Sequence, residues 1–269
     1  LAPRFEDPSA RALLLGAARA LPRSPHLRGD TARAVAVLRR KDELLARLAR
    51  ADAAIAPSQF LAAMFERNGF PGPKLRTVPY GLEPGRVERR AVTRPRRPLR
   101  VGFAGVLSPW KAPHVLVRAA LRVRGELTVT LHGRTEEGMF QGYIDELRRE
   151  AAADPRIRFP GPFDHGQLSD VMAELDLLVV PSVWYENTPF VVLEAFEAGV
   201  PVAVSALGGM TEVVEPGVHG FTFPAGDVAA LAALLQRLVD APAALATLRP
   251  RPVESIAGNV DVFEPLWRG

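Results

Sequence analysis

Two carboxylates and a helix start lie close together in the stretch 181–204. Glu186 stands in a loop that follows an apolar run, and Glu194 comes eight residues later. Thr188 suits the N-cap of a helix and Pro189 suits its first position, so we expect a helix to begin there. Because eight residues return a side chain to nearly the same helix face, the spacing predicts that both acids face one cleft beside the helix N-terminus.

The apolar run before this loop, residues 175–180, is typical of a buried parallel strand. Ligands of open parallel sheets bind outside the carboxyl ends of the strands, where this loop begins. A helix N-terminus attracts anions, and a carboxylate accepts hydrogen bonds from hydroxyl groups. The cleft therefore suits a ligand that is anionic at one end and rich in hydroxyls at the other, as a nucleoside diphosphate sugar is.

Strands and helices alternate regularly from Leu99 onward, and these elements must position the two acids. The expected strands are 101–104, 127–131, 157–159, 175–180, 202–204 and 221–223. Further helices are expected to begin near Pro113, Glu136, His165, Gly208 and Asp227. This repetition predicts an α/β fold with a doubly wound parallel sheet and crossover connections.

The part of the chain before this alternation is less regular. A helix is expected from Asp30 to about Ala51, followed by a strand–helix–strand passage at 53–78 in which Ser58 caps the helix. Residues 81–98 combine prolines with many arginines and few apolar residues. This composition is typical of a linker that crosses the surface.

Composition places the chain among ordinary globular proteins. Its 269 residues are 48% apolar and 24% charged, enough for one large domain or two modest ones. No apolar run approaches the roughly 18 residues of a membrane helix. The chain has no cysteine, which excludes disulfides and thiolate metal sites and is compatible with the cytoplasm as the expected location.

Charge is distributed unevenly along the chain. Residues 1–100 hold 21 Lys and Arg against 9 Asp and Glu, whereas the remainder holds 13 against 21. Such a basic half could attract an anionic membrane surface, which would make the protein peripheral to the membrane, or a phosphate-bearing acceptor. The arginines are scattered, however, which favours a simply soluble surface. No nucleic-acid-binding motif accompanies the charge, so no nucleic acid partner is expected.

The paired acids belong to a longer pattern. After Glu194 come an Ala-Gly-Val-Pro-Val run at 198–202, the glycine pair at 208–209, Glu212, and glycines at 217 and 220. In this order the run resembles the donor-site signature of retaining GT-B glycosyltransferases of family 4, also called glycosyltransferase group 1. The resemblance is specific because the whole run occurs between the right elements.

The resemblance implies a domain organisation. Residues 99–249 would form a Rossmann-like donor-binding domain of GT-B type, preceded by the linker at 81–98. Residues 1–80 would form part of an N-terminal, acceptor-side domain, and residues 250–269 a helix that crosses back to it. Only about 80 residues precede the linker, fewer than a full domain of this kind needs. We therefore expect the acceptor-side domain to be incomplete here.

The implied activity is transfer of a hexose from a nucleotide sugar, a UDP- or GDP-sugar above all, to an acceptor hydroxyl. Configuration at the anomeric carbon would be retained, and neither a metal nor a separate cofactor would be needed. The acceptor would be a glycan, a lipid-linked sugar or a small molecule, which places the protein in carbohydrate biosynthesis. The Glu174-x-Asp176 pair superficially resembles a metal site, but Asp176 opens a buried strand.

Two residues are the expected catalytic groups by this resemblance. Lys111 precedes a helix start and would stabilise the charge that grows on the leaving diphosphate. Glu186 would lie beside the transferred sugar, and Glu194 would accept hydrogen bonds from the ribose hydroxyls. With these three, the donor-binding candidates are Gly105, His132, Asn187, Thr188, Pro189 and Phe190. Two alternatives stay open. Lys111 and Glu186 could be solvated surface groups, and His132 could have a purely structural role.

The sequence departs from the family pattern beside Lys111. Val106 stands where many members have arginine, and Ala112 replaces the usual glycine. One of two usual cationic contacts would then be missing, and whether Arg134 substitutes for it is left open by the sequence. A second class of function therefore stays open, namely a non-catalytic nucleotide-sugar-binding module or subunit. Such a module would need self-association or a partner chain to complete the acceptor side.

Overall fold

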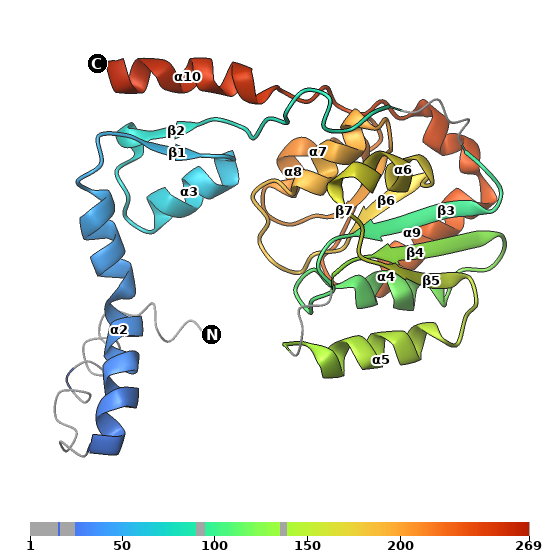
Figure 1. The fold of residues 1–269 in the computed structure, drawn as a ribbon, viewed down its shortest axis with the longest axis horizontal. Helices are drawn as coiled ribbons and strands as arrows, with labels where there is room; N and C mark the ends of the chain where they lie inside the picture. Colours follow the sequence, from blue (N-terminus) through green and yellow to red (C-terminus); the bar gives the residue numbers. More distant parts are fainter. Residues whose placement is uncertain (1–15, 17–24, 90–94, 135–138, 269) are drawn as a thin grey trace. The chain divides into compact units, whose positions relative to one another are not determined.

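The computed structural model describes residue 16 and residues 25–89, 95–134 and 139–268 (Figure 1). The chain divides into two compact units. The first comprises Leu1–Ala54 and Met64–Arg76, and the second comprises Ile55–Ala63 and Thr77–Gly269. None of the helices in the described ranges is both long and apolar enough to span a bilayer.

The N-terminal part is built on helix α2, Pro25–Leu48. The expectation that this helix starts at Asp30 is wrong, because it begins at Pro25, and proline is well accommodated in a first helical turn. Lys74 Nζ donates to the carbonyl oxygens of Ala49 and Ala51 at 2.9 and 2.7 Å. These bonds join the turn that follows α2 to the residue before β2.

A short two-stranded sheet follows this helix. It contains β1, Ala54–Ala56, and β2, Leu75–Thr77, and between them lie helix α3, Gln59–Arg67, and the 3-10 turn η2, Gly72–Lys74. The predicted cap of α3 is confirmed, because Ser58 Oγ accepts from Leu61 N at 3.1 Å.

The large sheet has six parallel strands in the order β5-β4-β3-β6-β7-β8. The strands are β3 Leu99–Ala104, β4 Leu127–His132, β5 Ile157–Gly161, β6 Leu177–Val180, β7 Val202–Ser205 and β8 Gly220–Phe223. The chain runs outward from β3 to β5, returns to β6 and runs outward again on the other side. The predicted doubly wound α/β fold is therefore confirmed, and its switch point lies between β3 and β6.

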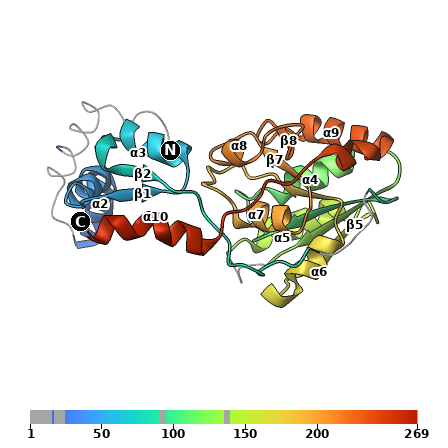
Figure 2. The same cartoon turned by 90° about the horizontal axis from the view of Figure 1, so that it is seen from above.

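Helices cover both faces of this sheet (Figure 1), as the view from above also shows (Figure 2). Helices α4 Pro113–Ala120, α5 Gln141–Ala151 and α9 Val228–Asp240, with the 3-10 turn η4 Pro242–Thr247, bury one face. Helices α6 Leu168–Ala173, α7 Phe190–Glu197 and α8 Met210–Val213 bury the other. Helix α10, Ile256–Arg268, ends the described chain.

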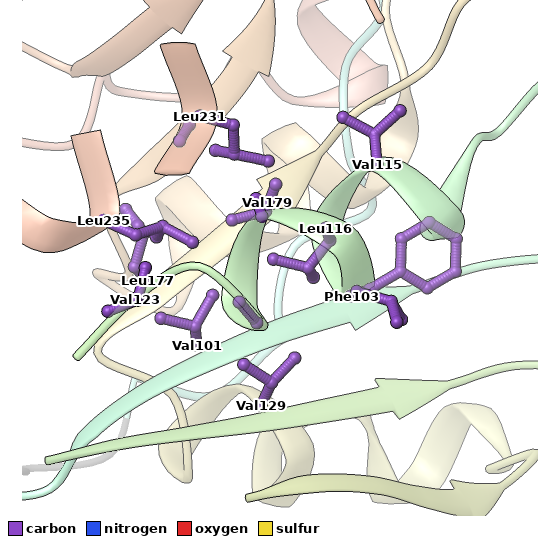
Figure 3. Packing of buried hydrophobic residues seen from close by; sticks show 14 of the residues in the cluster. Val101, Phe103, Val115, Leu116, Val123, Val129, Leu177, Val179, Leu231 and Leu235 are labelled. Atoms are coloured by element: carbon purple, nitrogen blue, oxygen red, sulfur yellow. The ribbon is translucent and has the colours of Figure 1, made fainter. Parts of the chain in front are cut away.

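Side chains of one strand alternate between the two cores. Leu177 and Val179 pack in the cluster under α4 and α9, whereas Leu178 and Val180 pack under α6 and α7. Figure 3 shows the first cluster, in which Val101 on β3 lies among residues of α4 and α9. A strand buried on both faces explains why residues 177–180 read as an unbroken apolar run.

Several expected helix starts are corrected. Helix α5 begins at Gln141 after Phe140, whereas the start predicted at Glu136 lies outside the described residues. The helix expected from His165 opens as the 3-10 turn η3, His165–Gln167, before α6. The predicted cap of α9 is confirmed, because Asp227 Oδ1 accepts from Ala230 N at 2.9 Å.

The segment before β3 packs against the rest of the second unit. Val87 is buried in the cluster under α6, and Glu88 N donates to Ser169 Oγ at 2.9 Å. Asp176, which is fully buried, accepts from Arg96 Nε at 3.2 Å and from Arg100 N at 2.9 Å. The Asp176 carboxylate thus ties the start of β3 to the start of β6.

Candidate functional site

A cavity of about 370 Å³ opens at the carboxyl ends of β3, β4 and β5, beside the switch point of the sheet. Three loops that follow these strands contribute to it, together with the first turns of α7. Its lining residues are Ala104, Gly105, Val106, Gly133, Arg134, Pro162, Phe163, His165, Val191 and Glu194. This is the place where parallel sheets of this type bind their ligands.

Two glycines bring backbone to the cavity wall. Gly105 has a φ of 154°, and its N–H donates to the carbonyl oxygen of His132 at 3.0 Å. A Cβ added at Gly133 would lie 2.1 Å from the Gly105 carbonyl oxygen. Only glycine therefore lets these two loops approach so closely, which exposes backbone rather than side chains to a ligand.

Glu194 is the carboxylate of the cavity. Its side chain is only 9% exposed, and Oε1 accepts from Arg86 Nε at 2.9 Å. Arg86 also donates from a terminal nitrogen toward His165 Nδ1 at 3.5 Å, and His165 lines the same cavity. A buried carboxylate with an arginine partner stays charged without the full desolvation penalty of an isolated ion.

Lys111 and Glu186 form a separate ion pair. Lys111 Nζ lies 2.6 Å from Glu186 Oε1, which also accepts from Ser182 Oγ at 3.0 Å. Their two loops are joined by a backbone hydrogen bond, in which Val183 N donates to the Trp110 carbonyl oxygen at 2.8 Å. Neither Lys111 nor Glu186 belongs to the described residues that line the cavity of Glu194.

The turn after Lys111 shows what the family's glycine would provide. Ala112 is the N-cap of α4 and has a φ of 52° and a ψ of 43°. This left-handed conformation costs an alanine roughly 1–2 kcal/mol and a glycine nothing. The chain therefore keeps an alanine in a strained conformation between Lys111 and the first turn of α4.

The loop before α7 differs from its prediction. The helix begins at Phe190 with Pro189 as N-cap, and no side chain caps it, so the prediction of Thr188 as N-cap is wrong. Pro189 has an extended ψ of 125°, which places the first helical turn after the proline. Because Glu186 precedes the helix by four residues, helical spacing cannot place it on one face with Glu194.

The glycine pair at 208–209 shapes this same loop. Gly209 N donates to the Glu186 carbonyl oxygen at 2.8 Å. A Cβ added at Gly209 would lie 1.5 Å from the Asn187 carbonyl oxygen, and one added at Gly208 would lie 2.7 Å from that of Glu186. These glycines are needed because the backbone beside Glu186 runs directly against them.

His132 lies behind the cavity wall. Its ring meets Phe163 edge-on with centroids 5.8 Å apart, and Phe163 lines the cavity. Burial lowers the pKa of His132, and its Nε2 has no hydrogen-bond partner among the described groups. Burial therefore favours the neutral form of this imidazole.

The other candidates lie in or beside the loop before α7. Thr188 and Pro189 are buried, Asn187 is partly buried, and Phe190 is half exposed and stacks on Tyr80 with centroids 5.1 Å apart. The structure thus brings Gly105 and Glu194 together in one cavity and Lys111 and Glu186 together in one pair.

Sequence reasoning missed three residues at this site, namely Arg86, Phe163 and His165, and it left the placement of Arg134 open. Arg86 is one of several arginines in a segment whose composition predicts a linker, so it did not stand out as a site residue. A signal existed for Phe163 and His165, since both follow the end of an expected strand. Arg134 also follows a strand end, directly after Gly133, and lines the cavity beside Val106.

The sequence pattern of the family described as glycosyl transferases group 1 matches residues 98–241. The chain belongs to this family. The matched range contains every residue that lines the cavity, as well as Lys111 and Glu186. Arg86 lies outside the matched range.

Curated relatives of this group 1 chain include two mycobacterial proteins. A D-inositol 3-phosphate glycosyltransferase of Mycolicibacterium smegmatis is 33% identical over 147 residues, which are 54% of this chain and 34% of the relative. A glycogen synthase of Mycobacterium tuberculosis is 35% identical over 158 residues, which are 57% and 37% of the two chains. The chain spans about one third of the length of these relatives.

Solved structures share the fold of this group 1 chain. A sucrose-phosphate synthase from Thermosynechococcus elongatus superposes with a TM-score of 0.74 at 26% identity, over 85% of this chain and 61% of that one. Anabaena HepE, solved in complex with UDP and glucose, gives a TM-score of 0.71 at 24% identity, over 89% and 67%. These structural neighbours are GT-B glycosyltransferases, so the expected fold family is confirmed.

Proposed function

We propose that the chain carries the donor site of a glycosyltransferase that moves a sugar from a nucleoside diphosphate sugar to an acceptor hydroxyl. The observation that carries this proposal is the cavity at the switch point, where a buried, charged Glu194 and two close-packed glycine loops meet. Family membership and relatives named as a glycosyltransferase and a glycogen synthase support it. Retention of configuration and transfer of a hexose without a metal are further parts of the proposal.

The cavity suits the nucleotide part of the donor. Glu194 would accept hydrogen bonds from the ribose hydroxyls, and the Phe163 ring offers a face or edge for the base. The backbone at Gly105 and Gly133 would lie beside the phosphates, where Arg134 supplies a cationic side chain. Val106, which also lines the cavity, is apolar.

Lys111 and Glu186 suit the reacting part of the donor. Negative charge grows on the diphosphate as the anomeric bond breaks, and the Lys111 ammonium would stabilise it. The ion pair of Glu186 with Lys111 would then weaken. Glu186 would bind a sugar hydroxyl or stabilise the positive charge that develops on the sugar ring. The ion pair of 2.6 Å thus holds both groups in place before a donor binds.

One observation favours the alternative of a binding module. Lys111 is already neutralised by Glu186, and Val106 adds no second cation beside it. Binding of a nucleotide sugar without its turnover would support this alternative. In either case we propose residues 99–249 as the donor-binding domain and residues 250–269 as its C-terminal extension.

Donor hydrolysis and sugar transfer test the proposal directly. The parent chain, Lys111→Ala and Glu186→Ala are incubated with UDP-glucose, GDP-mannose and ADP-glucose, and release of the nucleoside diphosphate is measured. Arg118→Ala is the matched control, because Arg118 forms an ion pair with Glu150 between α4 and α5, outside the candidate site. We expect turnover by the parent and the control and a loss of about 100-fold or more in the other two variants. Equal rates in all four proteins would refute the proposal.

A further inference from the structure

We propose that Arg86 is a positioning residue for donor recognition. Its guanidinium holds the Glu194 carboxylate in one orientation. One carboxylate oxygen is then bound by the protein, and the other is left for a ribose diol. This inference rests on the proposed function, because it assigns the nucleoside to the cavity of Glu194. It adds to the site a residue that lies outside the part of the chain matched by the family pattern.

The hydrogen bonds of Glu194 show this division of its two oxygens. Oε1 accepts from Arg86 Nε at 2.9 Å, whereas Oε2 accepts from no described group. Fully buried side-chain atoms without a partner are Ser108 Oγ, His132 Nε2 and Ser205 Oγ among the described residues. Because Oε2 is not one of them, it retains contact with open space, and the open space beside Glu194 is the cavity.

The backbone around Arg86 fixes the place of its guanidinium. Arg86 N donates to the Glu83 carbonyl oxygen at 3.1 Å, which closes a turn through Gly85, whose φ is 77°. The next residue, Val87, is 3% exposed and packs in the core under α6 and α7. Arg86 therefore projects from a chain segment that is held on both sides.

A second contact restricts the guanidinium further. A terminal nitrogen of Arg86 donates toward His165 Nδ1 at 3.5 Å, so the group bridges the turn before α6 and the carboxylate on α7. Arginine can make two such contacts at once because its donors form a rigid planar fork, whereas lysine has a single ammonium on a flexible stem. The Arg86 side chain is 32% exposed and that of Glu194 only 9%, so the acid depends more on the pair than the base does.

The inference predicts a specific defect in diol recognition. Without Arg86 the carboxylate loses the group that fixes its orientation, and Oε2 is no longer held for the 2′- and 3′-hydroxyls. A charge-assisted hydrogen bond to a fixed carboxylate corresponds to a preference of roughly tenfold or more for a ribonucleotide over its 2′,3′-dideoxy form. A role in stability alone would lower the melting temperature of the protein and leave this preference unchanged.

The test measures binding of paired ligands by titration calorimetry. The ligands are UDP, GDP and ADP, each with its 2′,3′-dideoxy counterpart, and the proteins are the parent, Arg86→Gln, Arg86→Lys and the control Arg118→Gln. We expect the parent and the control to prefer the ribose form by about tenfold or more and Arg86→Gln by less than about threefold. Arg86→Lys should lie between them, since lysine restores the charge without the fork.

Two results would overturn the inference in different ways. If Arg86→Gln binds more weakly but keeps the full preference for ribose, Arg86 has only a structural role and the proposed function stands. If the parent binds none of the six ligands, the proposed function fails and this inference fails with it. Melting temperatures of all four proteins identify a variant that has lost its fold, and Arg86→Lys then decides the question.

Discussion

Replacing Lys111 by methionine separates the structural and chemical roles of the ion pair with Glu186. The substitution keeps the length and apolar stem of the side chain but leaves the Glu186 carboxylate, 13% exposed, with only Ser182 as a side-chain partner. Breaking a fully buried pair costs about 3–5 kcal/mol, and breaking an exposed pair costs at most about 1 kcal/mol. Because the Lys111 side chain is 31% exposed, we expect a loss of about 2 kcal/mol in the free energy of unfolding.

A second variant cancels this loss. In Lys111→Met with Glu186→Gln no charge remains uncompensated, so most of the stability should return. Sugar transfer should not return, because the cation that stabilises the leaving diphosphate is absent from both variants, and its removal costs about 100- to 1,000-fold in rate.

Urea denaturation followed by tryptophan fluorescence gives the stability of each variant, and Trp110 and Trp184 stand near the two substituted positions in the sequence. Transfer and donor hydrolysis are measured on the same preparations. A folded Lys111→Met protein that turns over its donor within about threefold of the parent rate would refute the role given to Lys111. Recovery of activity in the double variant would refute it as well.

Three further predictions concern other parts of the site. Gly209→Ala should distort the loop before α7 and abolish turnover, because its Cβ would lie 1.5 Å from a backbone carbonyl oxygen. Gly142→Ala on α5 is the control, since its Cβ meets nothing within 4 Å and turnover should stay unchanged. Equal activity of the two variants would count against the loop's role. Arg134→Ala should weaken binding of a nucleoside diphosphate by roughly tenfold in a binding titration. Adding Val106→Arg, at a position that also lines the cavity, should restore much of this affinity. An Arg134→Ala variant with unchanged affinity would remove this residue from the site. Burial lowers the pKa of His132, so its contribution to stability is fully present above the ordinary value of 6.5 and is lost as the pH falls through the folded pKa. His132→Gln should therefore lose less stability than the parent between about pH 7 and pH 5, as measured by urea denaturation, and parallel losses would contradict this assignment.

The fold was predictable because its signals are local. Runs such as 177–180 are apolar on every side chain, as a strand covered on both faces requires, and the alternation with helices follows the chain in order. Ser58 and Asp227 cap their helices as expected, because a cap depends on residues only three positions away. The predicted N-cap of α7 was wrong because Thr188 and Pro189 both suit a helix start, and tertiary packing around the buried loop selects between them.

The candidate site was predictable in its residue types but not in its partners. Glu194 and Lys111 were found from spacing and resemblance, yet their ion-pair partners lie 108 and 75 positions away along the chain. Arg86 is one of many arginines in its segment, and nothing in the local sequence distinguishes it from the others. Pairings of this kind depend on how the sheet brings distant loops together, which spacing along one chain does not encode.

Thermal unfolding in the presence of nucleotide sugars tests the central claim most directly. The parent and Glu194→Ala are melted with UDP-, GDP- and ADP-sugars, each at a series of concentrations. A ligand at 100 times its dissociation constant adds about 2.7 kcal/mol of stability, which corresponds to a rise of about 5 to 10 °C in the melting temperature. The account predicts such a rise for at least one donor with the parent and little or none with Glu194→Ala. Melting temperatures that stay unchanged with every donor, or that rise equally in both proteins, would contradict it.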